Sequence, residues 1–300
     1  MDLNLFAVIR CKETQRFSCI GGFAPLVVCL LFLAGCASTK IPQATLTSSD
    51  PEAVALVTAS QRAHGAMAWS TIRDLNVRCV GNWSSIGSRM RPRLADARFR
   101  RESEEALDLV GGTMVQLQKG RGGRKFVLRA PGRVTVWYNG QSDSREEVIR
   151  AAALEADAGK MFLLGPLYFQ RPGVILEKLG TAKIQGKECD QVLAVLRPGF
   201  GYADEDRVVL SIDHETQRLR RVSMTLAGIN DERGVDVTFD KWAQRSGVWW
   251  ATDYDERLRG RLMLPFHRWT LMDIKANHGF APRHPELLGE ALSEAAAQTR

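Results

Sequence analysis

Residues 208–226, with the sequence VVLSIDHETQRLRRVSMTL, predict two antiparallel strands joined by a tight turn. Val208, Leu210 and Ile212 recur at every second position, as on a strand with one buried face. Asp213–Thr216 supplies residues that favour turns, and the apolar pattern returns from Leu219 to Leu226. This stretch decides the fold class because the same pattern is repeated along most of the chain.

Further runs with a period of two continue this pattern on both sides of the first hairpin. They cover residues 95–100, 126–130, 134–138, 235–240, 248–254 and 269–276. Short strands joined by tight turns predict an antiparallel meander, and their alternation predicts one buried and one solvated face.

Helices are expected at only a few places. Asp50 can cap a helix whose first residue is Pro51, and Gly65 provides a stop at its end. Ser142 or Asp143 can cap another one. The expected helices cover residues 51–64, 143–158 and 285–298.

The composition is that of a globular protein. The chain has 300 residues, a formal net charge of +7, 45% hydrophobic and 25% charged residues. These values exclude a disordered tail, a collagen-like repeat and a polytopic membrane protein. Six cysteines are too few for a disulfide scaffold, and whether Cys79 and Cys189 are bonded stays open.

The N-terminus has the features of a secretory signal. Arg10, Lys12 and Arg16 precede an uncharged run from Ile20 to Ala34, which is too short to cross a bilayer as a helix. The run ends in Leu33-Ala34-Gly35-Cys36, which resembles the bacterial lipobox. Residues 1–35 are therefore expected to be a lipoprotein signal peptide, and Cys36 the site of lipid attachment.

The rest of the chain divides into three parts. Residues 36–49 are small, hydroxylated and interrupted by proline, so we expect a flexible tether that reaches about 20 Å. We expect residues 50–280 to form one domain and residues 281–300 a C-terminal helical tail. Ala37 stands where an aspartate usually signals inner-membrane retention, which favours the periplasmic face of the outer membrane in a diderm bacterium.

No catalytic or metal-binding pattern emerges. The five histidines form no HExxH motif and no pair at metal spacing, and they are expected at surface or capping positions. No G-x-S-x-G motif is present. We therefore expect neither an enzyme, nor a metal ion, nor a cofactor.

A basic segment lies between residues 89 and 101. In an exported lipoprotein its partner is expected to be an anionic lipid headgroup and not a nucleic acid. The alternative is solvated charge balanced by nearby glutamates. The candidate headgroup-binding residues are Arg89, Arg91, Arg98 and Arg100.

The most apolar stretch of the predicted domain is residues 161–169, MFLLGPLYF. It lies between expected elements, and Gly165-Pro166 breaks any long helix. We interpret it as a gate over the buried face of the sheet. The alternative is that these side chains fill a solid core. The candidate gate and cavity residues are Phe162, Leu163, Leu167, Tyr168, Phe169, Trp250 and Trp269.

The lipobox, the first helix and the meander together resemble the LolA/LolB-like superfamily of bacterial lipoproteins and lipoprotein carriers. The resembling segments are Ala63-His64-Gly65 with Trp69 and Ile72, Gly186–Asp190, Ser211–Thr216 with Leu219–Val222, and Gly247–Trp250. The resemblance implies an α+β fold: a strongly curved antiparallel sheet, an unclosed half-barrel, with helices across its concave face and an apolar cavity that takes acyl chains.

Three functions are compatible with this sequence. The first is an envelope lipoprotein that binds an acylated ligand, a lipid or lipopeptide, in an apolar cavity. The second is a structural or signalling lipoprotein that binds another envelope protein and has no ligand cavity. The third, a hydrolase with an unrecognised site, is disfavoured by the missing motifs. The first is the prediction.

Overall fold

The computed structural model describes residues 40–229, 231–260 and 263–280. The predicted signal peptide, Cys36 and the tail 281–300 lie outside these residues. By its internal contacts the chain divides after Ser38, and the unit described below begins at Thr39. Its elements are α2 (Pro51–His64), α3 (Ala66–Trp69), β1 (Asp74–Trp83), α4 (Ser85–Met90), α5 (Pro92–Ala95), β2 (Glu102–Asp108), β3 (Met114–Gly120), β4 (Gly123–Ala130), β5 (Arg133–Tyr138), β6 (Gln141–Ser142), α6 (Glu146–Leu164), the 3₁₀ helices η1 (Gly165–Gln170) and η2 (Ala227–Ile229), β7 (Val174–Ile184), β8 (Lys187–Leu196), β9 (Asp206–Asp213), β10 (Leu219–Leu226), β11 (Asp231–Arg245), β12 (Val248–Leu258) and β13 (Leu264–Ala276).

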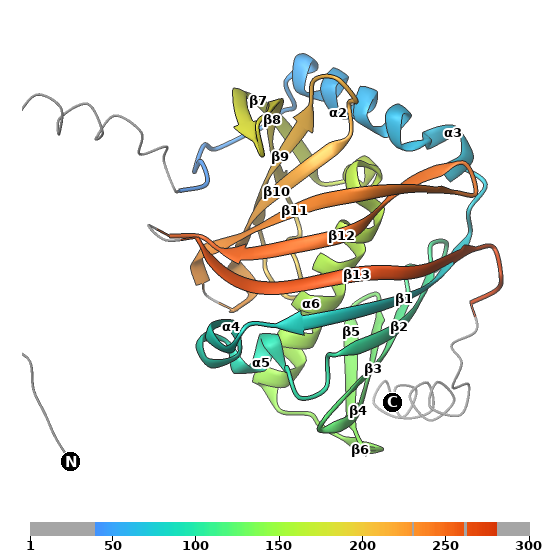
Figure 1. Cartoon of the computed structure of the whole chain (residues 1–300). Coiled ribbons are helices and arrows are strands. Elements are labelled where there is room, and N and C mark those ends of the chain that lie inside the picture. Colours follow the sequence, from blue (N-terminus) through green and yellow to red (C-terminus); the bar gives the residue numbers. More distant parts are fainter. Residues whose placement is uncertain (1–39, 230, 261–262, 281–300) are drawn as a thin grey trace, which may run out of the picture. The chain divides into compact units, whose positions relative to one another are not determined.

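The thirteen described strands form one antiparallel sheet in the order β6-β5-β4-β3-β2-β1-β13-β12-β11-β10-β9-β8-β7 (Figure 1). Strands that follow one another in sequence pair, except β6 and β7, and β1 pairs with both β2 and β13. The chain therefore starts in the middle of the sheet, meanders to the β6 edge, and then meanders back from the β7 edge. The sheet is strongly curved and is not closed into a barrel, as the sequence predicts.

The connection from β6 to β7 has to cross the whole sheet, because these two strands lie at opposite edges. α6 makes this crossing, and its 19 residues span about 28 Å. Residues 151–158 are all buried, five of them alanines, so that α6 can lie close to the strands.

α2 forms as the sequence predicts. The carboxylate of Asp50 accepts a hydrogen bond from the Glu52 amide at 2.9 Å, Pro51 is the first helical residue, and Gly65 ends the helix in a left-handed conformation. A Cβ atom at Gly65 would lie 2.3 Å from the carbonyl oxygen of Gly247. Glycine is thus required at this position by both the backbone angle and the close approach of the β11–β12 turn.

One predicted strand is absent, and one predicted helix is present with other bounds. Residues 95–100 form no strand: Pro92 starts the short helix α5, and Asp96 then adopts a left-handed conformation that turns the chain toward β2. The second helix starts at Glu146, with Arg145 and not Ser142 or Asp143 as its N-cap, and continues through Gly159 to Leu164, where Gly165 and Pro166 end it. The predicted gate segment is therefore the last turn of α6 followed by η1.

The predicted tether is also partly wrong, because residues 40–49 are attached to the sheet. Ile41 is buried against a patch of β8 and β9, formed by Leu193, Val195 and Val209. The guanidinium of Arg207 donates hydrogen bonds to the carbonyl oxygens of residues 42 and 44, at 3.1 and 2.8 Å. The outer face of β8 and β9, which the alternation predicts to be solvated, is covered here.

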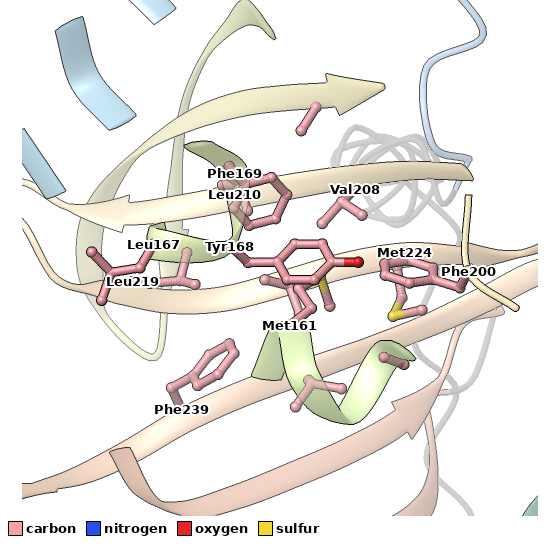
Figure 2. Close-up of a cluster of buried hydrophobic side chains, with 14 of the residues drawn as sticks. Met161, Leu167, Tyr168, Phe169, Phe200, Val208, Leu210, Leu219, Met224 and Phe239 are labelled. Carbon is pink, nitrogen blue, oxygen red and sulfur yellow. The ribbon is translucent and has the colours of Figure 1, made fainter. Parts of the chain in front are cut away.

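The main core lies between α2, α6, η1 and the second meander. Figure 2 shows Tyr168 and Phe169 of η1 in this cluster, together with Val208 and Leu210 of β9. Phe200, from the β8–β9 connection, contributes a fully buried ring. η1 is therefore part of the packed core and does not cover an opening.

Two histidines that the sequence places at surface or capping positions, His64 and His267, are buried. His64 Nε2 accepts a hydrogen bond from the Leu219 amide at 3.1 Å, and its ring lies edge-on to Trp242. Burial, and secondarily the charge of Arg218, lowers the pKa of His64 to about 3. The neutral ring thus joins the end of α2 to the start of β10.

We expect acid to destabilise the protein through His64. The unfolded chain takes up a proton near pH 6.5, whereas the folded chain does so only near pH 3. Stability is therefore fully present above about pH 6.5 and falls by about 1.4 kcal/mol per pH unit below it. His64→Gln, which keeps an acceptor, should be less stable at pH 7 but lose less stability on acidification. Urea unfolding at pH 7, 6 and 5 measures this, and parallel pH profiles for the two proteins would refute it.

We also expect Ile41→Ala to destabilise the protein by about 2–3 kcal/mol, because it removes a buried side chain from the patch on β8 and β9. The same change should speed proteolytic cleavage within residues 40–49. Thr45→Ala, at an exposed position of the same segment, is the matched control and should change stability by less than about 0.5 kcal/mol. If Ile41→Ala behaves like this control in chemical unfolding and proteolysis, the segment is not bound as described.

Candidate functional site

A cavity of about 110 Å³ lies between α6 and the middle of the sheet. Its walls come from α5, α6, the strands β1–β3 and the strands β10–β13. On α6 the lining residues are 154, 155, 158, 159, 162 and 163, which form one face of the helix. Since one water molecule needs about 10–15 Å³ of such a cavity, there is room for several waters or for part of an acyl chain.

One wall of the cavity is apolar and aromatic. Phe162 lies 5.6 Å from Trp269 between ring centres, and Trp269 stacks on Tyr254 at 4.8 Å with nearly parallel planes. Leu163 and Leu154 of α6 extend the same wall. These side chains offer a dry surface on which methylene groups can pack.

Another part of the lining is polar, which distinguishes this cavity from the uniformly apolar one that the sequence resemblance implies. This polar wall carries Glu105 on β2, Gln116 and Gln118 on β3, and Glu155 on α6. Glu105 Oε1 accepts hydrogen bonds from Ser103 Oγ at 2.6 Å and from Gln116 Nε2 at 3.0 Å. Burial raises the pKa of Glu105 above its ordinary value.

Glu155 is the centre of a buried ion network. Its two oxygens lie 3.0 Å from Arg100 Nε and 3.2 Å from Lys125 Nζ, and it also accepts a hydrogen bond from Gln118 Nε2. Lys125 in turn lies 3.1 Å from Asp96. The two positive and two negative charges balance, so the network fixes α6 to β3, β4 and the α5–β2 connection without leaving a net buried charge.

His267 is stacked between two indole rings at one end of the cavity. Its ring lies 3.9 Å from that of Trp83 and 4.9 Å from that of Trp269. Arg100 covers the other face of Trp83, with 4.6 Å from its guanidinium carbon to the ring centre. Glu256 Oε2 lies 3.8 Å from His267 Nδ1.

Glu256 and His267 do not form an ion pair at neutral pH. Burial raises the pKa of Glu256 to about 7, while burial, and secondarily the charge of Arg100, lowers the pKa of His267 well below its ordinary value. Both shifts oppose the charged forms, so at neutral pH the contact is not an ion pair. The wall beside the indole rings therefore presents weakly charged groups.

The predicted headgroup arginines are not brought together around this cavity. Only Arg100 lines it, and Glu155 already neutralises its charge. Arg89 and Arg98 are exposed and outside the lining. Arg91 is buried, with its guanidinium carbon 5.8 Å from the centre of the Phe266 ring.

The predicted gate is divided in the structure. Phe162 and Leu163 line the cavity, as Trp269 does. Leu167, Tyr168 and Phe169 are instead buried in the core beside it (Figure 2). Trp250 is also in the core, where its indole lies 5.9 Å from that of Trp69.

Sequence reasoning missed the polar wall. Its signal is present in β3, where Gln116 and Gln118 alternate with Val115 and Leu117. Alternation of this kind normally indicates that the glutamines face solvent. Here both faces of the strand are buried, since Val115 and Leu117 join an apolar cluster that Phe280 contacts on the other side of the sheet.

Other candidate chemistry finds no support within residues 40–229, 231–260 and 263–280. Cys79 and Cys189 are both free thiols. The described part of the chain has no group of three or more potential ligands that could hold a metal ion. It also contains no helix with the length and apolar character needed to cross a bilayer.

Neither a protein-family model nor a curated protein sequence matches this chain. Several solved structures are similar to it. A DUF1329 family protein from Desulfovibrio piger is 14% identical, with 79% of this chain and 97% of that chain covered and a TM-score of 0.48. A LolA superfamily protein from Nitrosomonas europaea is 9% identical, with 77% and 98% covered and a TM-score of 0.49. The lipoprotein LppX from Mycobacterium tuberculosis is 10% identical, with 78% and 99% covered and a TM-score of 0.28. These likenesses concern the fold, and the LolA-superfamily resemblance predicted from the sequence is found again among them.

Proposed function

We propose that this chain is a lipid-anchored protein of the bacterial envelope that binds an acylated ligand in the cavity between α6 and the sheet. The observation that carries the proposal is the cavity itself, with the aromatic wall of Phe162, Tyr254 and Trp269 on one side. The role is binding, without a catalysed reaction. The anchor is Cys36 in the lipobox, and the location is the periplasmic face of the outer membrane.

The energetics favour an acyl chain as the occupant. Each methylene group that moves from water to the apolar wall contributes about 0.8 kcal/mol. About eight methylenes thus contribute about 6 kcal/mol, which is comparable to the lower estimates for the entropic cost of association. The apolar contact of a short acyl segment is therefore expected by itself to give weak, reversible binding.

A neutral apolar dye that fluoresces in dry surroundings, N-phenyl-1-naphthylamine, tests the cavity independently of any headgroup. We expect residues 39–300 to bind it and Phe162→Ser to weaken binding about tenfold, because the change removes the ring that lies on Trp269. Phe99→Ser is the matched control, since Phe99 is also half-buried but lies outside the lining. Circular dichroism verifies that each variant is folded. If the wild-type protein binds no dye, the proposal fails and the protein-partner function takes its place.

The anchor is tested separately. Cys36→Ala should leave an uncleaved precursor that incorporates no radiolabelled palmitate, because the lipid is attached through the cysteine sulfur. The wild-type chain should be processed, labelled and recovered with membranes. Cys79→Ala, at a cysteine within the domain, is the control and should be labelled like the wild type. Normal labelling of Cys36→Ala would refute the proposed attachment site.

A further inference from the structure

The polar wall of the cavity contains two buried acceptors without partners. Gln116 and Gln118 are 3% and 1% exposed and both line the cavity. Their Nε2 atoms donate to Glu105 and Glu155, which fixes the orientation of each amide. Their Oε1 atoms have no hydrogen-bond partner among the described residues. A buried carbonyl oxygen left in this state is costly, which indicates that another group satisfies it.

The two acceptors have a defined spacing. Gln116 and Gln118 are two positions apart on β3, so they share one face and their backbones are about 7 Å apart. Trp83 Nε1, on β1 in the same lining, is a buried donor that also has no partner within the described part of the chain. An occupant of this wall would therefore supply two donors and at least one acceptor. Hydroxyl groups do both.

The charges of the wall disfavour an anionic headgroup. Arg100 and Lys125 are both neutralised by Glu155, and Lys125 also by Asp96. The carboxyl groups of Glu105 and Glu256 lie in the same lining, and burial raises the pKa of both, so this part of the lining offers no positive charge to an anion. Arg101 also belongs to the lining, but it is exposed to solvent, where its charge is screened. An uncharged headgroup needs no positive charge from the lining, so the neutralised state of Arg100 and Lys125 does not weaken its binding.

Building on the proposed function, we infer that the polar wall is a subsite for an uncharged polyhydroxyl headgroup, such as a glycerol or a sugar, carried by the acylated ligand. Its hydroxyl groups donate to Gln116 Oε1 and Gln118 Oε1 and accept from Trp83 Nε1. The acyl chain then lies along Phe162 and Trp269. Ordered water in the same positions is the alternative occupant.

Headgroup preference tests this inference. Residues 39–300 are loaded with N-phenyl-1-naphthylamine, which is then displaced by 1-monolauroylglycerol or by laurate, two lipids with the same acyl chain. We expect monolauroylglycerol to displace the dye at about tenfold lower concentration. In Gln116→Met this preference should fall below about threefold, because the change removes the acceptor Oε1, together with the Nε2 donor to Glu105, at nearly constant volume. The dye affinity of each protein is measured first, and the preference is the ratio of the two displacement constants corrected for that affinity.

The controls separate this inference from the proposed function. Gln244→Met, at an exposed position of β11 outside the lining, should keep the full preference. Gln118→Met should act like Gln116→Met, provided that circular dichroism shows it to be folded; otherwise Gln116→Met alone decides. Equal displacement by the two lipids, or stronger displacement by laurate, means that the wall holds only water and overturns the inference while the cavity proposal stands. Absence of dye binding by the wild-type protein overturns both.

Discussion

The crossing of the sheet by α6 is the constraint on which the rest of this structure depends. The first meander ends at β6 and the second begins at β7, at opposite edges of a thirteen-stranded sheet. A connection of this kind has to traverse one face, and a helix does so without leaving backbone groups unpaired. One helix is too narrow to cover the whole face of a strongly curved sheet. α6 and η1 pack against the strands β7–β10, but a space remains between α6 and the strands β1–β3.

The ion network of Glu155 explains why that space persists. Glu155 needs the partners Arg100, Lys125 and Gln118, and these come from the connection before β2 and from β3 and β4. Breaking such a buried set leaves uncompensated charge, which typically costs several kcal/mol. α6 is thus held at the distance that the four side chains require, and cannot move closer to the sheet to close the cavity. The same interaction that fixes the helix gives the cavity its polar wall.

Much of the fold could be predicted from local chemistry. Alternation along β9 and β10 and the residues Asp50 and Gly65 depend only on near neighbours, and the structure confirms these predictions. The predicted strand at 95–100 is wrong, although its apolar and polar residues do alternate. Pro92 starts a short helix there and Asp96 adopts a left-handed conformation, and these two residues determine the backbone.

The candidate site was less predictable, since it depends on contacts between distant residues. Gln116 meets Glu105 only through the pairing of β2 and β3, and its side chain is indistinguishable in sequence from one that faces solvent. Tyr168 and Phe169 were candidate gate residues because they are apolar and lie between predicted elements. The sequence does not show that their side chains pack against β9. Gating and core packing need the same residue types, so only the positions of the strands separate the two functions.

The bound segment before α2 changes how the proposed anchor would act on the domain. A free tether from Cys36 to residue 49 would let the domain turn in any direction about 20 Å from the bilayer. Ile41 is instead held on the outer face of β8 and β9. Even a fully extended chain spans at most about 3.6 Å per residue, so Ile41 would lie within about 18 Å of a lipidated Cys36. The outer face of β8 and β9 is therefore the one that lipid attachment would bring to the membrane, and the domain would have a preferred orientation there. For a protein that takes an acylated ligand, such an orientation matters because it determines whether the cavity can exchange its contents with the bilayer or only with the aqueous phase.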